Sequence, residues 1–323
     1  MNLAPSETRF EVAPKIGLFH EAAADIAALR TVMVNVVFVG VPGTSHWVLV
    51  DAGLFGSAKR IRAAAELRFG PGARPAAIIL THGHFDHVGA IGELSESWDV
   101  PVYAHPLELP YLTGRSSYPP PDPTVGGGAM AWLASAYPKR PIDLGPRVHA
   151  LPHDGVVPEL PGWRWIHTPG HTAGHVALFR ESDRALISGD AVITTRQESA
   201  LAVLEQRPEL NGPPAYFTPD WQSARDSLQH LASLHPSVLV TGHGVPVRGD
   251  NMQEELQRLA RDFDLLAVPE KGRYVPVPAV TNQHGVVSVP PRRWGKVAFA
   301  LAAVATVGAI GLIAAIARAD EEL

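Results

Sequence analysis

The sequence of 323 residues contains no cysteine. The chain therefore forms no disulfide bond, offers no thiolate to a metal and has no cysteine nucleophile, which fits a reducing compartment. Any metal site must be built from imidazole and carboxylate groups. Basic residues are also not concentrated in any block within the body of the chain, and the formal net charge is -5. Nucleic acid is therefore not expected as a partner.

The N-terminal stretch also lacks a targeting signal. Residues 1–15 contain no apolar run of the kind that forms a secretory signal peptide, so none is expected. Charged residues make up only 18% of the chain and hydrophobic residues 46%, which indicates an ordinary folded protein with a sizeable core. The length by itself allows one large domain or two.

The first part of the chain alternates between β-branched apolar runs and stretches of helix-forming residues. Residues 34–40 and 47–51 are β-branched runs on either side of a Pro-Gly turn, which predicts a hairpin. Ser57 is suited to cap a helix over 57–69, which Gly70 would end. A strand over 76–80, a helix over 88–98 and a strand over 101–104 follow. This order predicts an α/β layered domain.

Residues 105–146 interrupt the alternation with proline-rich and glycine-rich stretches. An irregular segment of this length inside a compact domain is usually a functional lid or an insertion. Its aromatic side chains could line a substrate pocket or pack against the body of the protein. They are Tyr111, Tyr118, Trp132 and Tyr137.

Regular structure is expected again after this insertion. Short strands over 147–151, 163–167, 175–179 and 184–188 predict a second sheet. A helix over 220–234, a strand over 237–241 and an amphipathic helix over 251–266 follow. Residues 1–266 are therefore expected to form the folded domain.

Residues 267–296 are rich in proline, valine and glycine and predict an extended linker with one short hairpin. Residues 297–317 carry no charge, and as a helix they would be about 31 Å long, against ~30 Å for a bilayer core. They predict a transmembrane helix in the lipid bilayer, with a buried core helix as the alternative. Basic residues precede this run, and the short tail 318–323 is mostly acidic. The expected protein is therefore membrane-anchored, with the large N-terminal domain in the cytoplasm.

The densest group of metal-binding side chains lies in residues 81–89, directly after the apolar run 76–80. His82 and His84 can converge on one metal from a tight loop, while Asp86 and His87 point to a second position. Four possible ligands within six residues, where a buried strand meets a loop, predict a site for two adjacent metals.

Three further candidate ligands each follow an expected strand. His171 comes after the strand 163–167 and a Pro-Gly turn. Asp190 follows the strand 184–188, and His243 follows the strand 237–241. Asp51 and His175 are better suited to fixing loops and ligands than to touching a metal.

In this order the pattern resembles the metallo-β-lactamase-fold hydrolase superfamily, closest in motif style to its glyoxalase II-like and lactonase-like branches. The resemblance spans residues 34–266 and implies a four-layer αββα sandwich with the site at one edge. It also implies the distribution of ligands. One ion would be bound by His82, His84 and His171, the other by Asp86, His87 and His243, with Asp190 bridging the two.

The resemblance further implies a dinuclear metal-dependent hydrolase. A metal-bridging hydroxide would attack an ester, thioester or lactone carbonyl of a small-molecule substrate, and Asp86 would orient that nucleophile and take its proton. Imidazole and carboxylate ligands suit zinc first, and iron or manganese as well.

Several alternatives stay open from the sequence. They are an iron-dependent sulfur or oxygen oxidoreductase on the same fold, a phosphodiesterase or nuclease, and a non-catalytic metal-binding membrane protein. Related lactonases have a tyrosine shortly after the bridging aspartate, whereas residues 191–195 read Ala-Val-Ile-Thr-Thr. Basic residues that would bind the carboxylates of glutathione are also not identifiable.

Overall fold

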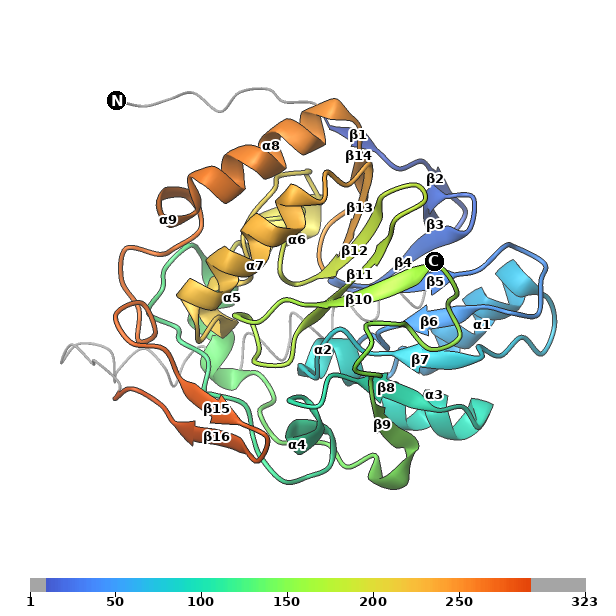
Figure 1. Cartoon of the computed structure of the whole chain (residues 1–323), viewed down its shortest axis with the longest axis horizontal. Helices are drawn as coiled ribbons and strands as arrows, with labels where there is room; N and C mark the ends of the chain where they lie inside the picture. Colours follow the sequence, from blue (N-terminus) through green and yellow to red (C-terminus); the bar gives the residue numbers. More distant parts are fainter. Residues whose placement is uncertain (1–9, 292–323) are drawn as a thin grey trace.

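The structure, a computed structural model, describes residues 10–291. Two β-sheets lie face to face, and helices cover the outer face of each sheet (Figure 1). The first sheet has eight strands in the order β2-β3-β4-β5-β6-β7-β8-β9, and the second has six in the order β1-β14-β13-β12-β11-β10. This arrangement is an αββα sandwich, as the resemblance implied.

The strands of the first sheet are β2 (Lys15–Ile16), β3 (Phe19–Ala23), β4 (Ile26–Thr31), β5 (Val34–Val39), β6 (Val48–Val50), β7 (Ala77–Ile79), β8 (Val102–Ala104) and β9 (Val148–Ala150). Those of the second sheet are β1 (Glu11–Val12), β10 (Trp163–His167), β11 (Val176–Arg180), β12 (Ala185–Gly189), β13 (Val238–Thr241) and β14 (Val247–Arg248). A separate hairpin consists of β15 (Val280–Asn282) and β16 (Gly285–Ser288).

The α-helices are α1 (Ala58–Phe69), α2 (Phe85–Val88), α3 (Ile91–Trp98), α4 (Leu109–Leu112), α5 (Ala129–Leu133), α6 (Ala200–Glu205), α7 (Trp221–Ser233), α8 (Asp250–Arg261) and α9 (Phe263–Leu266). Short 3₁₀ turns are η1 (Ala134–Ala136), η2 (Gly145–Arg147) and η3 (Ala215–Phe217).

The strand β5 shows why the sandwich forms. Successive side chains of a strand point to opposite faces of the sheet, and here both faces are buried. Val37 and Val39 contribute to the core between the two sheets, while Val36 and Phe38 contribute to the core beneath α1 and α3. A strand buried on both faces is therefore apolar along nearly its whole length.

The strand directions bring the predicted ligand loops to one edge. Strands β6 and β7 are parallel, and so are β12 and β13. Because parallel neighbours end on the same side of a sheet, the loops that follow them lie together. Asp51, the loop after residue 80, Asp190 and His243 all follow these strands.

Three predicted elements differ in the structure. Strand β9 pairs in parallel with β8 and completes the first sheet, although the sequence indicated the start of the second. The helix expected over 88–98 begins only at Ile91, as α3, after the separate short helix α2 has ended at Val88. The helix expected over 251–266 is split into α8 and α9. Strands β1–β4 were not predicted, because they are short or rich in alanine and charged residues, which have weak strand preference.

The segment after residue 266 forms the predicted hairpin and also contacts the body. Backbone N–H groups of Ala279 and Val286 donate to the Pro219 carbonyl at 3.0 Å and to Ser116 Oγ at 3.2 Å. The Tyr274 hydroxyl donates to a backbone carbonyl in the proline-rich insertion at 2.6 Å. Up to residue 291 this segment is therefore packed against the domain and the insertion.

The transmembrane part of the predicted fold is corrected. Within residues 10–291 no helix is long and apolar enough to cross a membrane. The 13 residues of α7 would span only about 20 Å of a ~30 Å bilayer core. The predicted span 297–317 and tail 318–323 lie outside the described residues. The membrane anchor and the bilayer contact thus find no support, and the cytoplasmic placement that depended on them is withdrawn.

Candidate metal centre

The structure brings the seven predicted ligand positions together at the edge of the sandwich. They form three overlapping groups, and within each group the potential ligand atoms all lie within 4.8 Å of one another. All seven side chains are buried, with exposed fractions between 0% and 6%. The groups are His82, His84 and His171, then Asp86, His87 and His243, and, between them, His82, His87 and Asp190.

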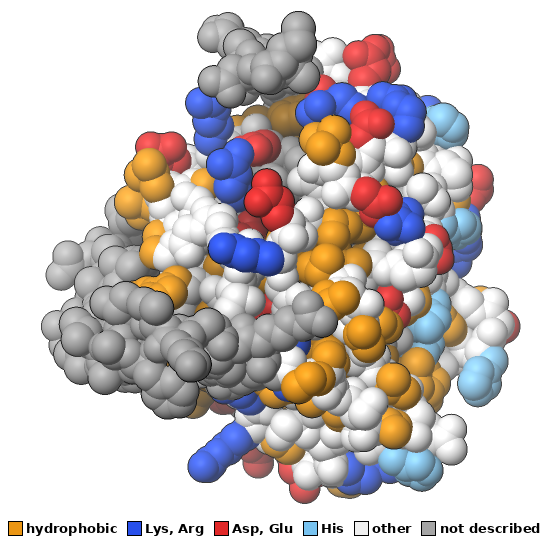
Figure 2. Space-filling view, turned by 90° about the vertical axis from the view of Figure 1, so that its left-hand side faces the viewer, with side chains coloured by type: hydrophobic (Ala, Val, Ile, Leu, Met, Phe, Trp, Pro, Cys, Tyr) orange, Lys and Arg blue, Asp and Glu red, His pale blue; other side chains and the backbone are white. Residues whose placement is uncertain are grey.

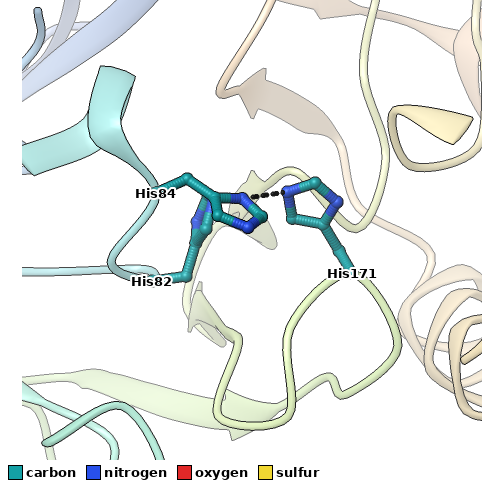
Figure 3. Close-up of side chains that lie close together, drawn as sticks. All are labelled: His82, His84 and His171. Carbon is teal, nitrogen blue, oxygen red and sulfur yellow. Dashed lines mark hydrogen bonds between the residues drawn. The ribbon is translucent and has the colours of Figure 1, made fainter. Parts of the chain in front are cut away.

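The first group joins two loops that lie far apart in the sequence. His82 and His84 project from the loop after β7, and His171 projects toward them from the loop after β10 (Figure 3). His84 Nδ1 and His171 Nε2 are 2.9 Å apart. The helix α2 begins immediately after His84 and carries Asp86 in its first turn. The turn between β7 and α2 thus directs His84 to the first group and Asp86 to the second.

Asp51 fixes the orientation of two of the histidines. Its carboxylate accepts hydrogen bonds from the backbone N–H and the hydroxyl of Thr81, each at 2.8 Å. It also accepts one from His87 Nδ1 at 2.8 Å, which leaves His87 Nε2 as the free lone pair. The Thr81 hydroxyl donates to Asp51, so it accepts from His82 Nδ1 at 3.1 Å. His82 Nε2 is therefore free as well.

His243 is oriented in the same way by a backbone carbonyl. Its Nδ1 donates to the carbonyl oxygen of Met33 at 2.8 Å, which turns Nε2 toward the carboxylates. His243 Nε2 lies 3.1 Å from Asp190 Oδ2 and 3.4 Å from Asp86 Oδ2.

Asp190 lies at the middle of the cluster. One carboxylate oxygen is 3.4 Å from His87 Nε2, and the other is 3.4 Å from His171 Nε2. Its backbone N–H donates to His175 Nε2 at 3.0 Å, and His175 Nδ1 is 2.7 Å from Thr168 Oγ1. The His175 side chain therefore supports the backbone of Asp190. Asp51, by contrast, supports the side chains of His87, directly, and of His82, through Thr81.

Four buried polar atoms of the cluster lack a hydrogen-bond partner among residues 10–291. Three of them, His82 Nε2, His87 Nε2 and Asp190 Oδ1, belong to the residues of the central group, and the fourth is His171 Nδ1 in the first group. An unpaired buried polar atom typically costs about 1–3 kcal/mol, so native structures rarely keep several together without a bound species. Two imidazole lone pairs and a carboxylate oxygen are the donor set of a divalent metal ion. The residues present therefore fit such an ion.

Burial lowers the pKa of the histidines in the first group. The pKa of His84 falls to about 3, and those of His82 and His171 also fall well below the ordinary value. Positive charge on neighbouring imidazoles adds to this effect. These imidazoles are therefore neutral at pH 7, which is the form that binds a metal.

Around Asp190, the charges of the carboxylate and of the neighbouring histidines shift one another's pKa values toward the charged forms. Burial alone would raise the pKa of Asp190, but charge on His243 and His87 outweighs it and holds this pKa well below the ordinary range. Conversely, burial opposes charge on His87 and His243, yet Asp190 raises the pKa of both. Burial raises the pKa of Asp86. The environment of Asp190 is thus suited to a cation.

Two aromatic residues and one acidic residue that were not predicted as metal ligands also lie at the site. The rings of Tyr118 and Phe217 lie 4.6 Å and 4.5 Å from the ring of His84, measured between centroids. Tyr118 comes from the insertion, where an aromatic pocket wall was one of two predictions. Glu108 is completely buried beside the ligand loops and was not predicted to take part. Its position in an irregular segment after His105-Pro106 gives no sequence signal for that role.

Comparisons with known proteins identify the family and the relatives of this chain. The family model described as the metallo-beta-lactamase superfamily matches residues 29–243, which include all seven positions. The probable metallo-hydrolase YflN of Bacillus subtilis (strain 168) is 51% identical over 245 residues, or 76% of this chain and 93% of that protein. A hydroxyacylglutathione hydrolase of Bdellovibrio bacteriovorus is 29% identical over 165 residues, or 51% of this chain and 47% of the relative. The solved structure of the BLEG-1 B3 metallo-beta-lactamase shares the fold, with a TM-score of 0.50 and 21% identity over 70% of this chain and 93% of that chain.

Proposed function

Because the chain belongs to the metallo-beta-lactamase superfamily and is a metal-dependent hydrolase, we propose a specific reaction for it. The protein hydrolyses a small-molecule ester, thioester or lactone at a two-metal centre. The proposed ligands are His82, His84 and His171 for one ion and Asp86, His87 and His243 for the other, with Asp190 serving both.

One observation carries this proposal. His82 Nε2, His87 Nε2, His171 Nδ1 and Asp190 Oδ1 are buried together without a hydrogen-bond partner among the residues that the structure describes. The first two nitrogens are free because their Nδ1 atoms are engaged with Thr81 and Asp51. This arrangement leaves lone pairs where an ion would need them, which supports a resident metal centre rather than an incidental histidine cluster.

Two divalent ions bound there would polarise a substrate carbonyl and lower the pKa of a water molecule toward ~7. The chain itself supplies orientation and proton transfer. Asp86 and His84 are the most exposed of the proposed ligands, each at 6%. We assign to Asp86 the role of orienting the attacking water and holding its proton on a carboxylate oxygen, because burial raises the pKa of this carboxyl group and so favours its protonated form.

Zinc is the proposed metal. The donor set combines imidazole with carboxylate and contains no thiolate, which suits zinc, and iron or manganese as substitutes. Burial keeps the imidazoles of the first group neutral, so they need no deprotonation before binding.

Two further observations support the proposed substrate class. The hydroxyacylglutathione hydrolase among the relatives hydrolyses, by its name, a thioester, which supports thioesters among the proposed substrates. Lysine and arginine side chains are intermixed with acidic ones on the face shown in Figure 2, so that face has no patch of one sign for a polyanion. Both observations favour a small carbonyl substrate over a nucleic acid.

Hydrolysis profiling tests the proposal. Thioesters, lactones, aryl esters and phosphodiesters are offered to one protein sample whose metal content is measured. We expect two ions per chain and turnover of at least one carbonyl class. His84→Ala should lose more than the roughly 10–100-fold that loss of a supporting residue costs, while His230→Ala, on the exposed face of α7, serves as the matched control. Phosphodiester cleavage alone, or a coloured iron protein that consumes O₂, would reject the proposed reaction.

A further inference from the structure

Glu108 is a buried carboxylate that belongs to none of the three ligand groups. It lies at the start of the insertion, immediately before α4, and its exposed fraction is 0%. A carboxylate in such a position is stable only if most of its lone pairs accept hydrogen bonds.

Four donors meet the carboxylate, two on each oxygen. Oε1 accepts from the Thr172 hydroxyl at 2.7 Å and from the backbone N–H of Gly174 at 2.9 Å. Oε2 accepts from the backbone N–H of Gly83 at 3.0 Å and from the Tyr118 hydroxyl. One oxygen therefore binds the loop that contains His171, and the other binds the loop between His82 and His84.

We propose that Glu108 is a positioning residue that sets the spacing of the two loops carrying His82, His84 and His171, and so tunes the affinity of that metal position. The inference rests on the metal centre proposed above. A single rigid carboxyl group joins backbone atoms that are 25 and 66 residues away in the chain. Loop spacing then depends on the length of one side chain rather than on loop packing alone.

The glycines of both loops fit this clamp. A Cβ at Gly174 would lie 2.8 Å from the backbone nitrogen and from side-chain atoms of Glu108, and a Cβ at Gly83 would lie 2.5 Å from the Tyr118 hydroxyl. Glu108 at Gly174, and the Tyr118 hydroxyl that donates to Glu108 at Gly83, thus leave no space for a side chain at either position.

Replacing the carboxylate by an amide removes one side of the clamp. A glutamine side chain accepts only through its single oxygen, because its nitrogen is a donor. The hydroxyl groups of Thr172 and Tyr118 can turn and accept instead, but the backbone N–H groups of Gly83 and Gly174 cannot. If the amide nitrogen faces Gly174, the backbone N–H of Gly174 is left unpaired against a donor. If the amide nitrogen faces Gly83, the backbone N–H of Gly83 loses the carboxylate and keeps only the Tyr118 oxygen, at 2.9 Å, as an acceptor.

The test is a metal titration of Glu108→Gln. Apo protein is titrated with Zn²⁺ against a chromophoric chelator, and the visible spectrum of the Co²⁺-loaded protein reports ligand geometry at the metal. We expect Zn²⁺ affinity at the position formed by His82, His84 and His171 to fall about 10- to 100-fold, with a changed Co²⁺ spectrum. The other metal position should keep near wild-type Zn²⁺ affinity. Asp122→Asn is the matched control, because Asp122 is 3% exposed and accepts bonds from Thr124 and Arg273, away from the ligand loops.

Three results separate the explanations. Wild-type affinity and spectrum in Glu108→Gln overturn the clamp, and so does an equal loss at both positions that Asp122→Asn reproduces. If the wild-type protein itself binds no Zn²⁺, the proposed metal centre fails, and the clamp fails with it. Thr172→Val removes a single donor and keeps the carboxylate. Should Glu108→Gln not fold, a smaller loss at the same position in Thr172→Val supports the clamp, and unchanged affinity overturns it.

Discussion

Gly242 provides a sharp test of how tightly the centre is packed. It lies between β13 and His243, and a Cβ added there would be 2.0 Å from Asp190 Oδ1 and 2.8 Å from His87 Cε1. The backbone of Gly242 is not among the residues with positive φ, so alanine meets no backbone strain at this position. The effect of Gly242→Ala should come from the collisions with Asp190 and His87, of which the one with Asp190 is the more severe.

The size of the collision decides the expected result. A carbon–oxygen contact is normally about 3.3 Å or longer, so Asp190 Oδ1 would have to move by about 1.3 Å. Asp190 has little room, because it is 2% exposed and its other oxygen lies 3.1 Å from His243 Nε2. Metal–ligand distances tolerate changes of only about ±0.2 Å. We therefore expect metal affinity to fall more than about 100-fold, which corresponds to roughly 2.7 kcal/mol.

The assay is a Zn²⁺ titration of Gly242→Ala together with thermal unfolding of the apo form. Gly92→Ala is the control, since Gly92 lies in α3 with no atom within 4 Å of an added Cβ. Alanine is preferred to glycine in a helix by up to about 1 kcal/mol, so this control should be as stable as the wild type or more so, with unchanged metal binding. Two ions bound to Gly242→Ala with wild-type affinity would refute the packing argument.

Three further predictions concern the support of the site and of the core. Asp51→Asn should weaken binding of the ion next to His87 by about 10–100-fold in a Zn²⁺ titration, because an amide cannot accept all three bonds of the carboxylate; unchanged affinity would show that Asp51 does not orient His87. Removing metal with a chelator should abolish hydrolysis and lower the melting temperature by about 5–10 °C, with recovery on adding Zn²⁺; a chelator-resistant activity would contradict the metal-dependent mechanism. Trp47→Ala should reduce the free energy of unfolding by about 3–5 kcal/mol in denaturant titrations, because the ring is fully buried and stacks on Phe69 at 4.4 Å; a loss below 1 kcal/mol would mean that this core relaxes around the cavity.

Much of the candidate site could be predicted because its signals are local. His82, His84, Asp86 and His87 lie within six residues, so their side-chain types and spacing alone indicate metal binding. The ends of buried strands are recognisable from short apolar runs, and the structure indeed has β7, β12 and β13 directly before the ligand loops. The helix expected over 220–234 is present as α7, and the Asp220 carboxylate at its start accepts the N–H of Ser223 at 3.0 Å.

The assignment of strands to sheets could not be predicted in the same way. β9 has an ordinary strand pattern, yet only its parallel pairing with β8 decides that it belongs to the first sheet. The strands β3 and β4 pair across residues 19–31 although alanine is frequent there, because burial against neighbouring strands compensates for weak strand preference.

The sequence by itself determined the chemical nature of the candidate site: imidazole and carboxylate side chains, without thiolate, in loops that follow strands. Only the tertiary structure decided which groups support those ligands. Asp51 reaches His87 across 36 residues, and Glu108 reaches Gly83 and Gly174 across 25 and 66. Hydrogen bonds over such distances leave no periodic or local pattern in the chain. They arise because parallel strands bring the ends of distant segments to one edge of the sandwich.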